Sequence, residues 1–239
     1  VVALLDGDVE PPKVDQTIYA TGRLVFPGSD DAHTHMEIPF GAATSKHTFE
    51  TGTRAAAWGG TTTIIDFPIQ MKGDSLIGSF EETMAKAAGS SAIDFGFHQI
   101  VGDVNEQSLA ELDLVLNEGV TSYKLFTAYP GVYFSTDGEV ARVMQWAAEN
   151  GSTILMHAEN GSAIDLLRAQ AIARGDTAPL AHAMTRPAAM EGEAAHRVIL
   201  LAEMTGAPVY IVHISADMFR CVPYGPASAP IPCVADSRI

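Results

Sequence analysis

Short apolar runs alternate with longer alanine-rich segments through the middle of this 239-residue chain. The apolar runs are rich in β-branched and aromatic residues, and several are almost continuously apolar, as in strands that are buried on both faces. A first strand is expected to lead into His33. Five further strands are predicted at 61–67, 93–100, 121–128, 153–159 and 209–215.

The segments between these strands are predicted to be helices. They end in glycine, a residue that often follows the last turn of a helix. Thr48 is a candidate N-cap for the first of them. The predicted helices span 48–59, 75–89, 108–119, 137–151 and 190–206.

Strands that alternate with helices at this spacing predict an α/β fold with a parallel sheet and crossover helices. An open doubly wound sheet fits the alternation, but no G-x-G-x-x-G sequence follows the first strand, which disfavours a dinucleotide-binding fold. A TIM-like (β/α)8 barrel remains, and it needs eight units. About six βα units can be counted, so we predict an incomplete barrel.

The two ends of the chain differ from this middle part. Residues 1–26 contain short β-like pieces broken by Pro11 and Pro12, and we expect them to be the remnant of a small β-sandwich module. Residues 27–215 would form the partial barrel. Residues 216–239 are an aberrant tail whose four prolines rule out a continuing helix.

Composition argues against several classes of protein. The hydrophobic fraction of 47% is ordinary for a globular chain, and no apolar run approaches the roughly 20 residues of a membrane span. The formal net charge of −15 argues against nucleic acid or an anionic membrane as a partner, because both favour a basic face. The N-terminus does not read as a signal peptide, and Cys221 and Cys233 are the only cysteines. We therefore expect a cytoplasmic protein without a disulfide framework.

Four histidines lie at or just after the ends of predicted strands. His33 and His35 follow the first strand, and side chains at i and i+2 of a strand point to the same side. His157 and His213 lie at the ends of two later strands, after "TILM" and "VYIV". A single strand histidine is more often a hydrogen-bonded core or rim residue, but recurrence at strand ends favours one shared metal site, because barrel active sites form there. The remaining histidines lack this placement and are interpreted as solvated or structural: His47, His98, His182 and His196.

Lys124 lies inside a predicted strand, which is an unusual place for a cation. Burial and nearby positive charge would lower its pKa and favour the neutral amine. A neutral amine can take up carbon dioxide, and the resulting carbamate is an anionic oxygen ligand able to bridge two metals. The alternative is a lysine that reaches the rim and pairs with an acid.

The chain resembles the dihydropyrimidinase and D-hydantoinase group of the cyclic amidohydrolases over about residues 20–215. The resemblance rests on six stretches together: "DAHTHMEIPF", "FETGTRAAAWGGTTTIIDFPIQ", "GVTSYKLFTAYPGVY", "ILMHAENG", "TRPAAMEGEA" and "VYIVHIS". It implies a (β/α)8 barrel with two Zn²⁺ ions bridged by carboxylated Lys124. By motif, His33 and His35 would bind the first metal, and His157 and His213 the second.

The resemblance also implies a reaction. A hydroxide that bridges the two metals would hydrolyse dihydropyrimidines or 5-substituted hydantoins to N-carbamoyl amino acids. Tyr129 matches the family tyrosine that stabilises the oxyanion, although a loop aromatic that packs over the barrel mouth is the alternative. The expected partner is a small cyclic amide, and the family implies a homo-oligomer, a tetramer.

The resemblance stops after Ser215. The family's acid/base group, an aspartate on the last barrel strand that also binds a metal, has no match, because Asp217 and Asp236 lie outside the right motif. A frameshift or a truncated gene would explain this, so a catalytically impaired fragment is one alternative to an active enzyme. The other is a non-enzymatic scaffold like the collapsin response mediators, which have lost metal ligands. The retained histidines and lysine argue against the scaffold, and zinc in freshly purified protein would distinguish the two.

Overall fold

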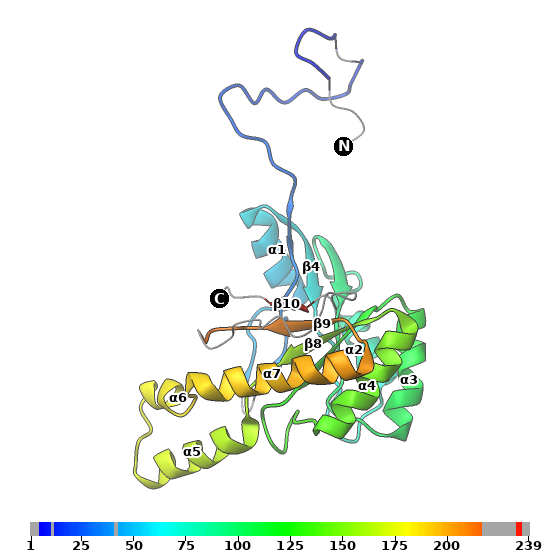
Figure 1. Cartoon of the computed structure of the whole chain (residues 1–239). Helices are drawn as coiled ribbons and strands as arrows, with labels where there is room; N and C mark the ends of the chain where they lie inside the picture. The colour runs from blue at the N-terminus through cyan, green and yellow to red at the C-terminus, as the bar shows by residue number, and fades with distance from the viewer. Residues whose placement is uncertain (1–4, 11, 41–42, 217–232, 236–239) are drawn as a thin grey trace, which may run out of the picture.

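The structure is a computed structural model of the whole chain, and it describes residues 5–10, 12–40, 43–216 and 233–235 (Figure 1). Most strands are parallel: β1 (Ser29–Asp31), β4 (Thr61–Asp66), β5 (Asp94–Phe97), β6 (Gln99–Ile100), β7 (Ser122–Phe126), β8 (Thr153–His157), β9 (Val209–Val212) and β10 (Cys233–Ala235). A small antiparallel pair is formed by β2 (Pro39–Phe40) and β3 (Ala43–Thr44).

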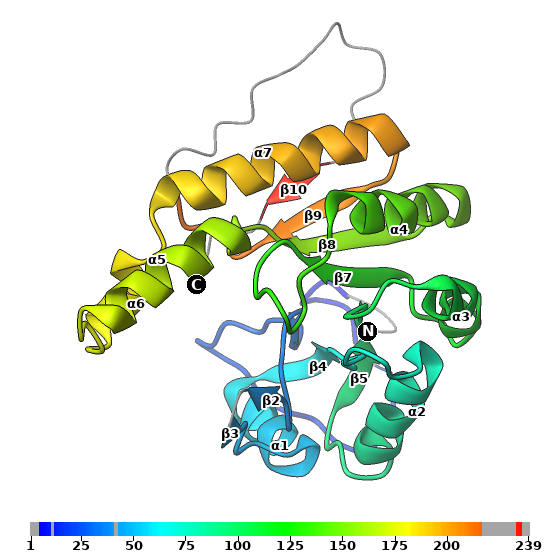
Figure 2. The same cartoon turned by 90° about the horizontal axis from the view of Figure 1, so that it is seen from below.

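The parallel strands form one curved wall. They pair in the orders β1-β4-β5 and β10-β9-β8-β7-β6. Only His98 separates β5 from β6, and its amide donates to Asp66 O at 2.8 Å while Ile100 N donates to Pro68 O at 2.9 Å. These bonds continue the pairing beside β4, so the two sheets are joined. Most of the helices lie along the outer side of the wall, which confirms the predicted partial (β/α) barrel (Figure 2).

The five predicted helices are present, and each begins within two residues of its predicted start. The helices of the structure are α1 (Phe49–Gly59), α2 (Leu76–Ala87), α3 (Glu106–Asn117), α4 (Asp137–Asn150), α5 (Gly161–Ala173), α6 (Leu180–Met184) and α7 (Ala188–Thr205). Thr48 caps α1 as predicted, because its hydroxyl accepts from Thr51 N at 3.1 Å. No helix in the described ranges is long and apolar enough to cross a membrane.

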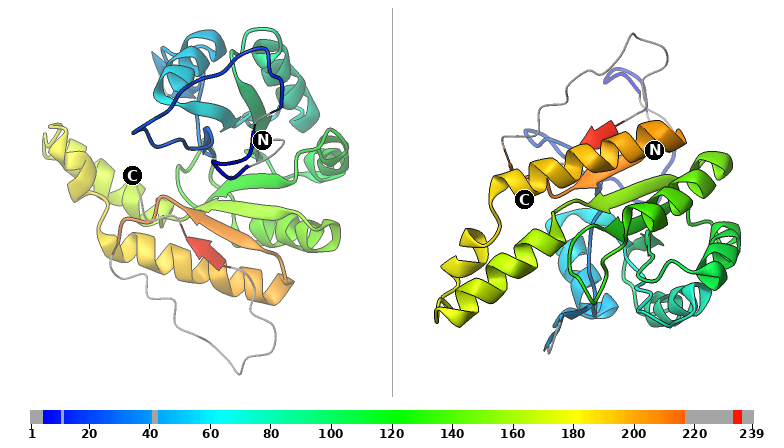
Figure 3. Two further views of the ribbon diagram at one scale, coloured as in Figure 1. Left: turned by 90° about the horizontal axis from the view of Figure 1, so that it is seen from above. Right: turned by 60° about the horizontal axis from the view of Figure 1, so that its bottom comes forward.

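Two helices were not predicted. α5 and α6 lie between β8 and α7 and project away from the strands (Figure 3). Asn160 caps α5 by accepting from Ala163 N at 3.1 Å, a signal that was available in the sequence. α6 has only five residues and no side-chain cap, so no periodic pattern could reveal it.

A further parallel strand, which was not predicted, lies where a tail without regular structure was expected. β10 pairs with β9 in parallel, with Cys233 opposite Val209 and Ala235 opposite Ile211. Three residues are too few to give a periodic signal, and the prolines before them argued against regular structure in this part of the chain. The rest of the tail lies outside the described residues, apart from Ala216, and its boundary at residue 215 stays a prediction.

The segment before β1 has no strand in the part that the structure describes. Residues 5–10 and 12–28 extend away from the wall, and Ile18, Tyr19 and Val25 are exposed (Figure 1). A strand needs a paired neighbour for its backbone N–H and C=O groups, and no described strand pairs with this segment. The expected β-sandwich module therefore stays a prediction.

Side chains on the strands divide between two apolar clusters. Along β7, Tyr123 and Leu125 pack with the helices in the larger cluster. The next residue along, Phe126, belongs to a second cluster with Phe67, Leu155 and other residues on the inner side of the wall. Because side chains of a strand alternate, Lys124 shares the inner side with Phe126.

Candidate metal centre

A buried carboxylate holds the loop that carries His33 and His35. Asp66 ends β4 and is 2% exposed. Its Oδ2 accepts from Thr34 Oγ1 at 2.9 Å and from Met36 N at 2.8 Å. These bonds alternate with the two histidines along the chain, so Asp66 fixes the backbone on which both imidazoles stand.

Lys124 lies against the first histidine. Its Nζ is 3.1 Å from His33 Nε2, and it lies 4.5 Å from the centre of the Phe67 ring and 5.2 Å from that of Phe126. The residue is 2% exposed, and burial lowers the pKa of its ammonium to about 7. The amine is therefore neutral in a large share of molecules near pH 7.

The other three predicted histidines complete the cluster. The ring centre of His33 lies 5.1 Å from that of His35 and 4.6 Å from that of His213. The rings of His213 and His157 are 5.7 Å apart. The structure thus brings together all four histidines and Lys124, which come from segments spread over much of the chain.

Burial and the nearby positive charges oppose protonation of His33 and His35. Burial, with Lys124 and His213 nearby, lowers the pKa of His33 to about 2. Burial, followed by the same two neighbours, lowers the pKa of His35 to about 4. Both imidazoles are therefore neutral at physiological pH, which is the form that binds metals.

The donor set fits a transition metal such as zinc. His35 Nδ1 is buried and has no hydrogen-bond partner, so a nitrogen is available in the cluster. Neutral imidazole suits zinc, copper, iron and nickel. In the part of the chain that the structure describes, no three His, Cys, Asp or Glu side chains already converge on one ion position. The histidines are neighbours whose donors have still to be aligned.

Tyr129 stands beside this cluster on the loop after β7. Its ring centre is 5.3 Å from that of His157. Burial, together with the Glu159 carboxylate, raises the pKa of Tyr129, so the hydroxyl keeps its proton near neutral pH. Tyr129 and His213 both have left-handed backbones, with φ of 61° and 59°. Such strained conformations in residues other than glycine gather at functional sites.

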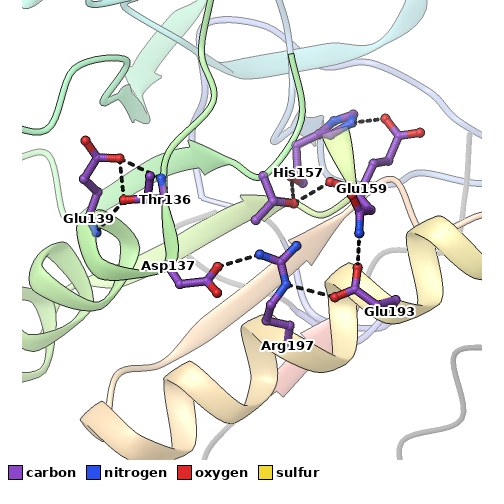
Figure 4. A network of polar contacts seen from close by, with 9 residues as sticks. Thr136, Asp137, Glu139, His157, Glu159, Glu193 and Arg197 are labelled. Carbon is purple, nitrogen blue, oxygen red and sulfur yellow. Dashed lines mark hydrogen bonds and ion pairs between the residues drawn. The ribbon is translucent and has the colours of Figure 1, made fainter. Parts of the chain in front are cut away.

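His157 has a carboxylate partner. Its Nε2 is 2.7 Å from Glu159 Oε2, and both side chains are 16% exposed (Figure 4). Arg186 Nε lies 3.6 Å from the other oxygen of Glu159. Burial acts to raise the pKa of Glu159, but the hydrogen bond with His157 and the Arg186 charge outweigh it and lower that pKa.

Sequence reasoning missed the supporting residues of this site. Asp66 ends the apolar stretch "TTTIID" and Glu159 lies two residues after His157, so the strand-end rule would have found both. Arg186 follows α6 and lies in the stretch "TRPAAMEGEA", but neither strand nor helix periodicity assigns it to the site. His98, which was interpreted as solvated or structural, bonds Ser122 Oγ with its ring, and its Nε2 lies 3.2 Å from Ala32 O.

The fold and these side chains define a (β/α)-barrel protein with a candidate metal centre at the carboxyl ends of its strands. Residues 24–218 match the Amidohydrolase family, and the chain belongs to this family. It is 58% identical over 202 residues to a D-hydantoinase of Streptomyces coelicolor and 46% identical over 201 residues to one of Geobacillus stearothermophilus. Each match covers 84% of this chain and 43% of the relative.

Solved structures agree with this assignment. One D-hydantoinase structure has a TM-score of 0.84 at 43% identity, covering 87% of this chain and 45% of that one. A D-hydantoinase (dihydropyrimidinase) from Thermus sp. has a TM-score of 0.85 at 34% identity, covering 88% and 46%. The predicted resemblance to the hydantoinase group is confirmed. The chain spans less than half the length of these relatives.

Proposed function

We propose that this chain supplies the metal-binding part of a cyclic amidohydrolase, which opens dihydropyrimidines or 5-substituted hydantoins to N-carbamoyl amino acids. The observation that carries the proposal is the 3.1 Å contact between Lys124 Nζ and His33 Nε2, in a buried cluster with three further histidines. The names of the relatives support the class of substrate.

The cluster offers ligands for two zinc ions. His33 and His35 would hold the first ion, and His157 and His213 the second. Lys124, once carboxylated, would bridge them. Bound zinc would supply a bridging hydroxide as nucleophile and a Lewis acid at the carbonyl of the ring.

Burial prepares Lys124 for carboxylation. With a pKa of about 7, the neutral amine has a free electron pair near physiological pH. That pair forms a bond to the carbon of CO₂, and the nitrogen releases a proton, which leaves a carbamate with one negative charge. The charge of the side chain thus changes from positive to negative, which suits a site filled with cations.

Tyr129 and the aromatic residues would serve the substrate. The protonated Tyr129 hydroxyl can donate a hydrogen bond to the oxygen that becomes negative when the ring carbonyl is attacked. Phe67, Phe126 and Tyr133 line the inner apolar cluster and exclude water from the reacting groups. No residue of this chain matches the family's last-strand aspartate, so proton transfer to the leaving nitrogen is assigned to none of its residues.

The test is hydrolysis of hydantoin and dihydrouracil, measured together with zinc content. The chain is compared with a version extended to the full length of its relatives. We expect zinc in both and much faster hydrolysis by the extended version. Equal rates would show that the last-strand aspartate is dispensable. Absence of zinc and of hydrolysis from the extended version would contradict the proposal and favour a scaffold.

A Lys124→Ala variant of the extended version sharpens this test. We expect it to lose zinc and activity, and propionate to restore part of both by replacing the carbamate. A Lys72→Ala variant, which alters an exposed lysine on the loop before α2, is the matched control and should behave as the unmodified protein. Sedimentation would test the expected homo-oligomer, which stays a prediction along with the cytoplasmic location.

A further inference from the structure

Helix α1 carries a glycine at a buried position where alanine would be the better helix former. The helix reads "FETGTRAAAWG", and Gly52 is its fourth residue. Glycine inside a helix weakens it relative to alanine, so glycine at a buried helical position points to a packing requirement. None of the proposed metal ligands lies on this stretch, although it is one of the motifs that resemble the hydantoinase group.

The Met36 side chain occupies the space that a side chain on residue 52 would take. A Cβ on Gly52 would lie 2.3 Å from Met36 Sδ and 2.7 Å from Met36 Cε. Heavy atoms in van der Waals contact are about 3.5–4.0 Å apart, so the thioether must lie directly against the backbone of the helix. We call the bare surface of α1 at residue 52 the Gly52 notch.

Met36 belongs to the segment that carries the first two proposed ligands, and it follows His35 directly. Its amide donates to Asp66 Oδ2 at 2.8 Å, which fixes its backbone to the end of β4. Its side chain lies in the Gly52 notch and packs on the larger apolar cluster. Met36 therefore joins the segment of the two histidines to two different elements, β4 and α1.

The next residue along the chain is bonded to the start of the same helix. Glu37 N donates to His47 O at 2.9 Å, and Glu37 Oε1 accepts from Phe49 N at 3.3 Å. The backbone of Glu37 is left-handed, with φ of 54°, and such a conformation persists in residues other than glycine only where the surroundings hold it. The contacts of residues 36 and 37 with α1 thus fix the course of the chain just after the two histidines.

We propose that Gly52 is a positioning residue: its lack of a side chain lets α1 receive the Met36 thioether, and this contact holds the segment of His33 and His35 in place for the first metal. The metal part rests on the proposed function, whereas the held segment is a property of the metal-free chain. The proposal gives the stretch "FETGTR" a role at the site, because α1 acts on the ligands through Met36.

The first experiment measures amide hydrogen exchange of the metal-free chain. Gly52→Ala fills the notch, so we expect the amides of Met36 and Glu37 to exchange about tenfold faster or more, while those of β8 keep their rates. Met36→Ala removes the thioether and should have the same effect. Because both substitutions abolish one contact, the double variant should exchange no faster than the faster single variant. Unchanged rates in Gly52→Ala, or additive effects in the double variant, would overturn the proposal.

Two control variants match these substitutions. Gly59→Ala makes the same change at the end of α1, where a Cβ would meet no described atom within 4 Å. Met204→Ala shortens an exposed methionine on α7. Both should leave the exchange of residues 36 and 37 unchanged. Alanine favours helix over glycine, so a general loss of structure in Gly52→Ala is not expected. Equal acceleration in Gly59→Ala, or equal acceleration of the β8 amides in Gly52→Ala, would overturn a specific role for the notch.

The second experiment measures zinc affinity by competition with a chelator. We expect Gly52→Ala to bind zinc about 10- to 100-fold more weakly, as is typical when the support of a metal ligand is lost, and Gly59→Ala to bind it as tightly as the unmodified chain. Full zinc affinity in Gly52→Ala would overturn the metal part of the proposal. Faster exchange in Gly52→Ala, together with no zinc binding by the unmodified chain, would support the held segment and contradict the proposed function instead.

Discussion

Asp66 shows how one residue can control a cluster that it does not join. It lies on the end of β4, yet it accepts hydrogen bonds from Thr34 and Met36 on the segment after β1, and from the amide of Phe67 at 2.7 Å. Because Thr34 lies between His33 and His35, a substitution of Asp66 should change the positions of both imidazoles. The carboxylate is buried, so loss of its oxygens would leave donors without partners.

We predict that Asp66→Ala lowers the free energy of unfolding by about 1 to 3 kcal/mol and also weakens zinc binding. Asp66→Asn should cost less, because the amide oxygen keeps one acceptor. Urea denaturation and zinc titration measure the two effects. Asp94→Asn, an exposed carboxylate on the neighbouring strand β5, is the control and should change neither. A stable Asp66→Ala chain with full zinc affinity would contradict this role.

The packing of whole elements depends on close backbone contacts at the ends of strands. Gly161 begins α5, and its amide donates to Thr127 O at 3.1 Å. A Cβ on this residue would lie 2.8 Å from both Ala128 Cα and Thr127 O, which are backbone atoms that cannot turn aside. The absence of a side chain therefore lets α5 start directly against the loop that leads to Tyr129.

We predict that Gly161→Ala destabilises the chain by about 1 to 3 kcal/mol, because the new methyl group forces the helix away from the loop. Gly138→Ala, in the first turn of α4, is a matched control, since a Cβ there meets no atom within 4 Å. That variant should be neutral or slightly stabilising, because alanine favours helix over glycine. Thermal unfolding of the two variants side by side measures the difference, and equal melting temperatures would refute the prediction.

The first turns of α7 hydrogen-bond to the segments that follow β8 and β9. Glu191 accepts from Ser215 N and Ser215 Oγ, both at 2.6 Å, just after His213. Two residues further on, Glu193 accepts a hydrogen bond from Asn160, which lies three residues after His157. Glu193 also pairs with Arg197, and Arg197 bonds Asp137 on α4 (Figure 4). The first turns of α7 thus hold both segments that carry the proposed ligands of the second metal.

We predict that Glu191→Ala speeds hydrogen exchange of the amides at residues 213–216 by about tenfold or more, because a lost bond of roughly 1.4 kcal/mol changes an opening equilibrium tenfold. Glu191→Gln should have a weaker effect. Glu203→Ala, an exposed carboxylate near the end of the same helix, should leave this exchange unchanged. Unaltered exchange in Glu191→Ala would mean that these bonds do not hold the segment.

At the scale of the whole molecule, folding brings together basic side chains, each of which disfavours a positive charge on its neighbours. His33 and His35 come from the segment after β1, Lys124 from β7, and His213 from the segment after β9. Burial, followed by repulsion from the neighbouring positive groups, disfavours the protonated forms of His33 and His35 in the folded state. The stability of the metal-free chain must therefore depend on pH.

We predict that the metal-free chain loses stability as pH falls from 7 to 5. The pKa values of His33 and His35 are about 2 and about 4 in the folded state, below the ordinary 6.5. Between pH 6.5 and about 4 the unfolded chain then binds more protons, so stability falls with pH, by at most about 1.4 kcal/mol per pH unit for each group. Lys124, with a folded pKa of about 7, adds to the slope in the same direction between pH 7 and 6, and adds little below pH 6, where it is protonated in both states.

Urea unfolding with a chelator at pH 5, 6 and 7 measures this slope. His33→Gln should flatten it, because the more strongly shifted group is removed. His196→Gln alters an exposed histidine on α7 and should keep the slope of the unmodified chain. A slope that is the same in all three proteins would contradict an origin in the cluster.

Much of the fold was predictable because its signals are local. Thr48, Ser75 and Thr136 each accept a hydrogen bond at the start of a helix, and such caps need only a few neighbouring residues. The apolar runs predicted the strands for the same reason. α6 and β10 were missed because five and three residues are too few for a period to appear.

The sequence by itself determined the alternation of strands and helices through the middle of the chain, the place of Lys124 within a strand, and the motifs of the amidohydrolase family. Only the tertiary structure decided that Lys124 meets His33 across 91 residues of chain, and that Asp66, Glu159 and Arg186 support the histidines. Local periodicity depends on a few neighbouring residues. Contacts between distant segments depend instead on how the sheet curves and where each strand ends, and no short stretch of sequence contains that information.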